Sequence, residues 1–180
     1  CTVHEHRLEV PLDHSKPISP TNPKIEIFAR EIIRPGGEKL PHLVFLQGGP
    51  GGKGPRQGDF RDGWIGEALK EFRVVLLDQR GTGQSTRMDW QALQELPDDQ
   101  ARADHLMLFR QDQIIKDAEA FRAEITDGAK WTTLGQSYGG FLTLAYLSTA
   151  PEAVEASLVT GGLPGLVHVD DIYRLSYEKT

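Results

Sequence analysis

Polar and apolar residues alternate in the first part of the chain, and this alternation predicts two β-strands. The two segments are His4–Leu12 and Ile25–Ile33. In the second segment Ile25, Ile27 and Ala29 fall on one face, and the residues between them fall on the other. The linker between the segments contains three of the eleven prolines, so it cannot form regular structure.

Continuous apolar segments follow, which are typical of strands buried on both faces of a parallel sheet. His42–Leu46 and Arg73–Leu77 are the clearest, and Trp131–Leu134 and Ala156–Thr160 are further candidates. The helical patterns cover Trp64–Phe72, Asp98–Asp127, Phe141–Thr149 and Asp170–Lys179. The second of these is the longest, and one apolar stripe runs along it, which predicts a single long helix.

This alternation of strand, loop and helix decides the fold class. It predicts an α/β domain whose sheet is mostly parallel and carries helices on both faces. The chain shows no internal repeat, no low-complexity segment and no composition change that would mark a linker between domains.

Composition and charge exclude several classes of protein. Hydrophobic residues make up 38% and charged residues 26% of the 180 residues, which is typical of a globular domain and not of a disordered chain. The formal net charge of −6 gives no general attraction for phosphate, so a nucleic-acid partner is not expected. The single cysteine, Cys1, rules out an intrachain disulfide and a cysteine metal cluster.

The sequence contains no pattern of a membrane span or a signal peptide. Its longest apolar run, Phe141–Tyr146, is far shorter than the roughly 20 residues that a membrane helix needs. No basic segment followed by an apolar one opens the chain. We therefore expect a cytoplasmic protein without a membrane partner. Because the first residue is not Met, we expect a processed or trimmed N-terminus, and a lipid anchor on Cys1 stays open.

The strongest chemical signal lies between a predicted strand and a predicted helix. Residues 135–140 read Gly-Gln-Ser-Tyr-Gly-Gly, which matches the G-x-S-x-G nucleophile turn. Glycines two positions before and after the serine permit a tight, strained turn that holds the hydroxyl clear of the sheet. The next helix points its N-terminus at the reacting group. We expect Ser137 to be the nucleophile, and an ordinary serine in a glycine-rich turn is the alternative.

A second glycine-rich loop directly follows the strand that ends at Leu46. It reads Gln-Gly-Gly-Pro-Gly over residues 47–51. In acyl-transfer enzymes such a loop supplies one oxyanion donor, and the residue after the nucleophile supplies the other. We therefore assign the oxyanion hole to the backbone N–H groups of Gly49 and Tyr138. A phosphate-binding Walker loop is excluded, because the chain has Gln47 and Gly54 where that motif needs Gly and Ser or Thr.

A third segment, Asp-Gln-Arg-Gly-Thr-Gly-Gln-Ser over residues 78–85, follows the buried strand Arg73–Leu77. It fails the dinucleotide-binding pattern, because Thr86 stands where a glycine is required. We expect Asp78 and Arg80 to tie this loop to its neighbours and to have no catalytic role.

The segments LQGGPGG, LLDQRGTGQS and LGQSYGGF, in this order and spacing, resemble the proline iminopeptidases of the α/β-hydrolase fold. The segment FRQDQIIKDAEAFR is similar to the longer members. The resemblance extends from about His4 to Pro164. It implies the N-terminal portion of an α/β-hydrolase, with the first six strands in a core over residues 1–165 and the start of a cap over 166–180. The chain departs from the family at Gln47, where the family has His. Because the backbone of Gly49 does the proposed work, we expect this change to be tolerated.

A serine nucleophile needs a histidine base and an acid that orients it, in the chain order Ser, acid, His. After Ser137 the only histidine is His168, and no acid that could come from a later strand precedes it, so we do not expect His168 to be the base. The chain also lacks an H-E-x-x-H motif. We expect a fragment whose missing C-terminal part supplies the acid, the histidine and, by resemblance, the acidic cap residues that hold a substrate's amino group.

The resemblance implies a serine aminopeptidase that releases N-terminal residues, preferentially proline, from peptides with a free N-terminus. It implies no cofactor and no metal. An esterase or an aminopeptidase of broader specificity is one alternative, and a non-catalytic hydrolase-like binding fragment is another. The isolated 180 residues are expected to be inactive, and their oligomeric state stays open.

Overall fold

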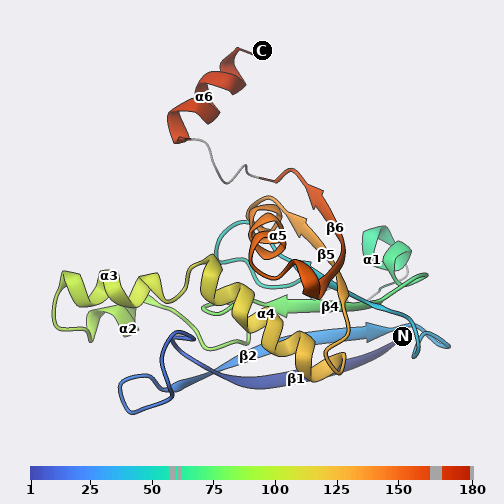
Figure 1. Ribbon diagram of the computed structural model, residues 1–180, viewed down its shortest axis with the longest axis horizontal. Coiled ribbons are helices and arrows are strands. Elements are labelled where there is room, and N and C mark those ends of the chain that lie inside the picture. Colours follow the sequence, from blue (N-terminus) through green and yellow to red (C-terminus); the bar gives the residue numbers. More distant parts are fainter. Residues whose placement is uncertain (57–59, 61, 163–167, 179–180) are drawn as a thin grey trace.

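The computed structural model describes residues 1–56, 60, 62–162 and 168–178. Six strands form one sheet in the order β1-β2-β4-β3-β5-β6 (Figure 1). The strands are β1 (Thr2–Pro11), β2 (Lys24–Ile33), β3 (His42–Leu46), β4 (Arg73–Asp78), β5 (Trp131–Gln136) and β6 (Val154–Thr160). All six strands that the sequence predicted are present, and their bounds differ from the predicted ones by no more than a few residues.

The sheet is mostly parallel, as predicted. β1 pairs antiparallel with β2, and β2 pairs antiparallel with β4. β3 lies between β4 and β5 and is parallel to both, and β6 is parallel to β5. Since β3, β4 and β5 run the same way, the loops that follow them meet at one edge of the sheet. The glycine-rich loop, the Asp-Gln-Arg segment and Ser137 all lie in these loops.

Helices cover the two faces of the sheet, and the side chains of each strand alternate between them. In β3, Val44 and Leu46 belong to an apolar cluster with α4 (Gln111–Ile125) and α5 (Tyr138–Thr149). Leu43 and Phe45 belong to a second cluster with α1 (Gly63–Ala68) on the opposite face. Figure 1 shows α4 and α5 side by side over the sheet. This layering places the N-terminus of α5 beside the carboxyl end of β3.

The predicted long helix over Asp98–Asp127 is wrong in one respect: the structure divides it into α3 (Asp99–Met107) and α4. At the break, the N–H groups of Leu108 and Phe109 form tighter bonds to carbonyls three residues back. The Leu108 carbonyl accepts a hydrogen bond from Arg80 at 2.7 Å, so it is taken up by a distant side chain. Sequence periodicity does not show such a contact, because the partner lies far away in the chain.

The other helices differ from the predictions mainly at their ends. α5 begins at Tyr138, directly after Ser137, and not at Phe141. α1 is shorter than predicted, and the short α2 (Trp90–Gln94) was not predicted. A 3-10 turn covers Pro151–Ala153, and α6 covers Val169–Tyr177. The predicted boundary between residues 165 and 166 lies outside the described residues and stays a prediction.

A buried carboxylate, Glu31 on β2, gathers basic groups at the end of the sheet where β3 and β4 begin. Its oxygens lie 3.0 Å from His6 Nε2, 3.0 Å from His42 Nε2 and 2.6 Å from Arg73 Nη2. Burial alone would raise the pKa of Glu31, but the hydrogen bonds from both histidines and the charge of Arg73 outweigh it and lower the pKa to about 2.

This depressed pKa makes the fold sensitive to acid. A carboxyl whose pKa falls from 4.5 unfolded to about 2 folded contributes stability above pH 4.5 that is lost as the pH falls towards 2. The contribution is about 3 kcal/mol. We expect Glu31→Gln to lower the free energy of unfolding at pH 7 and to flatten its decline between pH 5 and 3, measured by urea unfolding. Glu9→Gln, at the exposed pair with Lys24, is the control and should change neither quantity by more than about 1 kcal/mol. Equal pH profiles for the two variants would contradict the assignment.

Candidate active site

Ser137 occupies the turn between β5 and α5 in a backbone conformation that is rare for a residue with a side chain. Its φ is 56° and its ψ is −117°. Such an angle costs about 1–3 kcal/mol and persists only where the surroundings enforce it. The N–H of Ser137 donates to the Thr160 carbonyl at 3.0 Å, which fastens the turn to the end of β6.

The glycines around Ser137 are required by close backbone contacts. A Cβ on Gly139 would lie 1.8 Å from the Leu46 carbonyl oxygen, and one on Gly135 would lie 2.1 Å from the Gly139 carbonyl oxygen. A Cβ on Gly140 would lie 2.6 Å from Gly162 Cα. These distances are far below any real Cβ contact, so each glycine lets α5 start directly against the ends of β3, β5 and β6.

The Ser137 hydroxyl is not used to hold the helix together. Ser137 is the N-cap residue of α5, a position where a serine side chain commonly accepts a hydrogen bond from the first turn. Within the described residues its side chain makes no such bond, and the residue is only partly buried. The hydroxyl is therefore not taken up by capping of α5.

The glycine-rich loop after β3 lies directly against this turn. A Cβ on Gly48 would lie 2.3 Å from the Gln136 carbonyl oxygen and 2.9 Å from Ser137 Cβ. The next residue, Gly49, has φ +52°, and its N–H group is one peptide unit away from this contact. The structure thus brings the loop that contains Gly49 against the Ser137 turn, from segments that are far apart in the sequence.

Tyr138 is the first residue of α5, so its N–H group belongs to the open N-terminus of the helix. An α-helix leaves its first N–H groups without partners in the helix. At α5 the N–H of Gly140 is already bonded to the Ser137 carbonyl at 2.9 Å, which leaves Tyr138 and Gly139 as the donors without a helical partner. The positive end of the helix dipole favours negative charge there. This arrangement can stabilise an oxyanion next to Ser137.

A serine in a strained turn between a strand and a helix, at the carboxyl edge of a parallel sheet and beside a glycine-rich loop, is characteristic of one fold family, and the comparisons agree. A family model described as the alpha/beta hydrolase fold matches residues 41–175. The chain belongs to the alpha/beta hydrolase family. The resemblance to proline iminopeptidases that the sequence motifs indicated is confirmed by the relatives.

Two curated relatives of this alpha/beta hydrolase are named as proline iminopeptidases. That of Aeromonas sobria is 42% identical over 177 residues, which cover 97% of this chain and 41% of the relative. That of Aspergillus aculeatus is 37% identical over 90% of this chain and 37% of the relative. The chain thus spans well under half the length of these relatives.

Solved structures show the same fold. A proline iminopeptidase-related protein from Thermus thermophilus superposes with a TM-score of 0.56 at 25% identity, over 88% of this chain and 45% of that one. A thioesterase domain from the curacin biosynthetic pathway superposes with a TM-score of 0.60 at 16% identity, over 98% of this chain and 52% of that one. The expected class, the N-terminal portion of an α/β-hydrolase with six strands, is confirmed.

A small cavity of about 210 Å³ lies beside Tyr138 in the hydrolase. Its apolar wall includes Pro50, Phe109 and Ile114. Burial raises the pKa of the Tyr138 phenol above its ordinary value. The lining also includes Gln79, Arg80 and Thr82, so the cavity combines an apolar wall with polar groups of the loop after β4.

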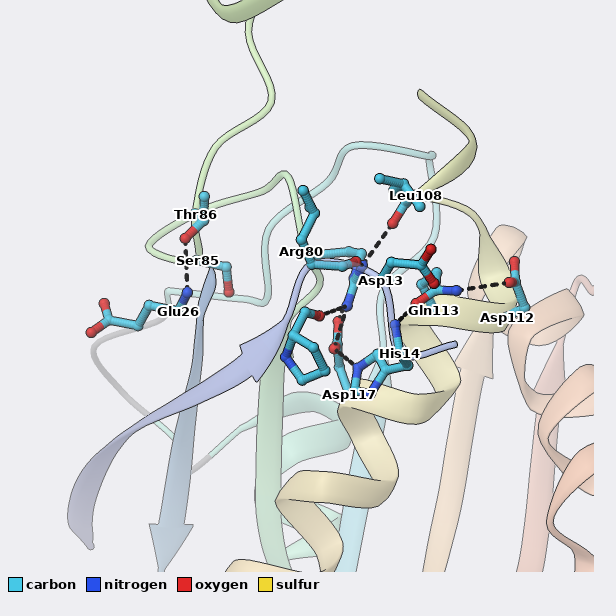
Figure 2. Close-up of polar contacts among 12 residues, drawn as sticks. Asp13, His14, Glu26, Arg80, Ser85, Thr86, Leu108, Asp112, Gln113 and Asp117 are labelled. Carbon is cyan, nitrogen blue, oxygen red and sulfur yellow. Dashed lines mark hydrogen bonds and ion pairs between the residues drawn. The ribbon is translucent and has the colours of Figure 1, made fainter. Parts of the chain in front are cut away.

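Buried charges fasten the loop after β4, as Figure 2 shows for Arg80 and Asp117. The Arg80 guanidinium donates two hydrogen bonds of 2.7 Å to the Asp117 carboxylate, and further bonds to the carbonyls of Leu12 and Leu108. His14 Nε2 lies 2.8 Å from the same carboxylate. The structural role predicted for Arg80 is confirmed. Asp78 is equally buried, and its contacts also tie neighbouring loops together.

All six histidines lie within the described residues, and none of them is a hydrogen-bond partner of Ser137. His168 is the N-cap residue of α6, and its side chain is 75% exposed beside Asp170. His6 contacts the buried Glu31 at the opposite end of the sheet. The described residues contain no group of three or more His, Cys, Asp or Glu that could hold a metal ion. No helix in the described ranges is long and apolar enough to cross a membrane.

Proposed function

We propose that this chain is the nucleophile-bearing part of a serine aminopeptidase that releases N-terminal residues, preferentially proline, from peptides. The observation that carries the proposal is the strained Ser137 turn, which faces the glycine-rich loop and the open N-terminus of α5. This is the arrangement that acyl transfer by a serine requires. The preference for proline is supported by the relatives that are named proline iminopeptidases.

In the proposed reaction, Ser137 Oγ attacks the carbonyl carbon of the substrate's first residue. A base removes the hydroxyl proton as the Oγ–C bond forms, and the carbonyl oxygen becomes an oxyanion. The N–H groups of Gly49 and Tyr138 stabilise that oxyanion. The C–N bond then breaks, the leaving amine takes the proton, and water hydrolyses the acyl-enzyme. Every group in this sequence is a protein group or water, so we propose no cofactor and no metal.

The base and its orienting acid would come from a C-terminal part of the same hydrolase. The relatives extend well beyond the region matched here, since this chain covers about 41% of the first of them. β6 lies at one edge of the sheet, and its Leu158 and Val159 side chains are 50% and 40% exposed. A cavity of about 380 Å³ between Trp64, Leu134 and Thr160 opens on the same part of the sheet. We propose that the C-terminal part covers this surface.

The proposed substrate is a peptide with a free N-terminus. The proposed compartment is the cytoplasm, which suits a chain with one cysteine and no disulfide. Neither proposal involves nucleic acid or a membrane.

A substrate panel tests this function in the full-length protein. We expect turnover of aminoacyl aryl amides with the highest kcat/KM for the proline amide, because the relatives are named for that residue. The matched comparisons are the alanine and leucine aryl amides, an N-acetylated proline amide that lacks the free amine, and a short-chain aryl ester. Turnover of the ester with no amide hydrolysis above background would instead support an esterase, and equal values for all amides would support a broad aminopeptidase.

A further inference from the structure

Two consecutive residues hold the glycine-rich loop at its two ends. Gln79 Nε2 donates to the Gln47 carbonyl at 2.9 Å, where the loop begins. The N–H of Gly54, where the loop ends, donates to Asp78 Oδ1 at 2.8 Å. The loop that contains Gly49 is thus clamped between residues 47 and 54 by adjacent side chains from the end of β4.

Both clamping residues are themselves fixed. Gln79 is 3% exposed, and its backbone carbonyl accepts hydrogen bonds from the N–H of Thr82 at 3.0 Å and from the Thr82 hydroxyl at 2.8 Å, which fix the main chain that carries the side chain. Asp78 is fully buried, and its second oxygen accepts from the N–H of Gln84 at 2.8 Å and from Arg56. A side chain with a single fixed position transmits that position to the group it binds.

The Gln79 contact acts very close to the expected oxyanion donor. It fixes the peptide unit between Gln47 and Gly48, and the next peptide unit contains the Gly49 N–H group. On the other side, the loop lies so close to the Ser137 turn that a Cβ on Gly48 would be 2.3 Å from the Gln136 carbonyl oxygen and 2.9 Å from Ser137 Cβ. Because the two peptide units are adjacent, rotation of the Gln47 peptide would change the direction of the following N–H group.

We propose that Gln79 is a positioning residue for catalysis: through the Gln47 carbonyl it orients the Gly49 N–H group towards the oxyanion. This inference rests on the proposed serine hydrolase function. In this proposal Gln79 touches neither the substrate nor Ser137. Its substitution therefore raises the energy of the tetrahedral species, which uses the Gly49 N–H group, and changes the affinity for the unreacted substrate little.

The test compares Gln79→Met with Gln113→Met in the full-length protein. Gln113 is 5% exposed, and its side-chain amide also bonds a backbone group, the N–H of His14, at 2.9 Å. Its amide N–H also donates to Asp112 at 3.2 Å. Gln113 belongs to α4 and not to the loops around Ser137, so its substitution removes the hydrogen bonds of a buried glutamine without the effect on Gly49. Gln79→Asn, which keeps a neutral amide but is one methylene shorter and so withdraws the N–H donor from the Gln47 carbonyl, replaces Gln79→Met if that variant yields too little folded protein.

We expect Gln79→Met to lower kcat for the proline aryl amide about 10- to 100-fold, with KM changed less than about 3-fold. The inhibition constant of prolinal, whose aldehyde forms a tetrahedral adduct with a serine, should rise by a similar factor. The inhibition constant of L-proline, which forms no adduct, should stay within about 2-fold. Gln113→Met should show a comparable fall in melting temperature with natural kcat.

Two results would overturn the inference, and they differ in meaning. If the natural enzyme is inhibited by prolinal but Gln79→Met resembles Gln113→Met in kcat and prolinal inhibition, Gln79 only stabilises the fold. If prolinal does not inhibit the natural enzyme, the proposed serine chemistry fails as well, and the role of Gln79 fails with it.

Discussion

Ser137→Ala in the full-length protein is expected to lower kcat for the proline aryl amide by about 10⁴- to 10⁶-fold. The substitution removes the oxygen that the strained turn presents beside the proposed donors, so no acyl-enzyme can form. The backbone conformation should survive, because alanine and serine meet the same steric cost at φ 56°. A fluorophosphonate probe should label the natural protein and not the variant.

The matched control is Ser148→Ala on the same helix. Ser148 is exposed, and its hydroxyl bonds the Leu144 carbonyl within α5. This variant should keep natural turnover and labelling, and both variants should have melting temperatures within a few degrees of the natural protein. Turnover by Ser137→Ala within tenfold of the natural rate would reject Ser137 as the nucleophile.

Arg80→Met is expected to cost about 3–5 kcal/mol of unfolding free energy. Arg80 and Asp117 are 0% and 1% exposed, so the variant leaves the Asp117 carboxylate buried with only His14 as a basic neighbour among the described residues (Figure 2). It also leaves the carbonyls of Leu12 and Leu108 without their donor. These groups join the linker after β1, the loop after β4 and the start of α4. The urea midpoint of unfolding measures the loss.

The control for this network is an ion pair on α3 outside the core. Arg102 and Asp99 are 33% and 96% exposed at 2.6 Å, and Arg102 also donates to the carbonyls of Leu93 and Leu96. Because these groups stay accessible to water, Arg102→Met should cost less than about 2 kcal/mol. The double variant Arg80→Met/Asp117→Leu should lose clearly less than the sum of the two single variants, because the second change removes the unpaired charge. Equal costs for Arg80→Met and Arg102→Met would show that the buried network does not stabilise the fold.

Much of the fold was predictable because its signals are local. The apolar segment of β3 gave the bounds His42–Leu46 without error, since five consecutive buried positions leave no ambiguity. The Ser137 turn was predictable for the same reason, because the glycines that permit it stand next to it in the sequence. The prediction of a single helix over Asp98–Asp127 was wrong. At the break between α3 and α4 the Leu108 carbonyl binds Arg80, which is distant in the sequence.

The polar cluster around Glu31 could not be predicted from the sequence, because its members are also distant from one another along the chain. Glu31, His42 and Arg73 come from three different strands, and only the sheet order brings them together. Gln79 was not singled out either, although its position directly after a buried strand was a signal. A polar residue directly after β4 lies at the edge of the sheet where the loops after β3 and β5 also lie. Which of these loops it binds depends on which strand lies next to β4, and the sequence does not show that.

The sequence by itself determined the α/β class, the six strands and the turn that carries Ser137. Periodicity, glycine positions and apolar runs act over a few residues, so they can be read without knowing the rest of the chain. Only the tertiary structure decided that β3 lies between β4 and β5, so that the glycine-rich loop meets Ser137 and is clamped by Asp78 and Gln79. Hydrogen bonds and ion pairs between distant segments have no sequence period, because they depend on which segments pack together.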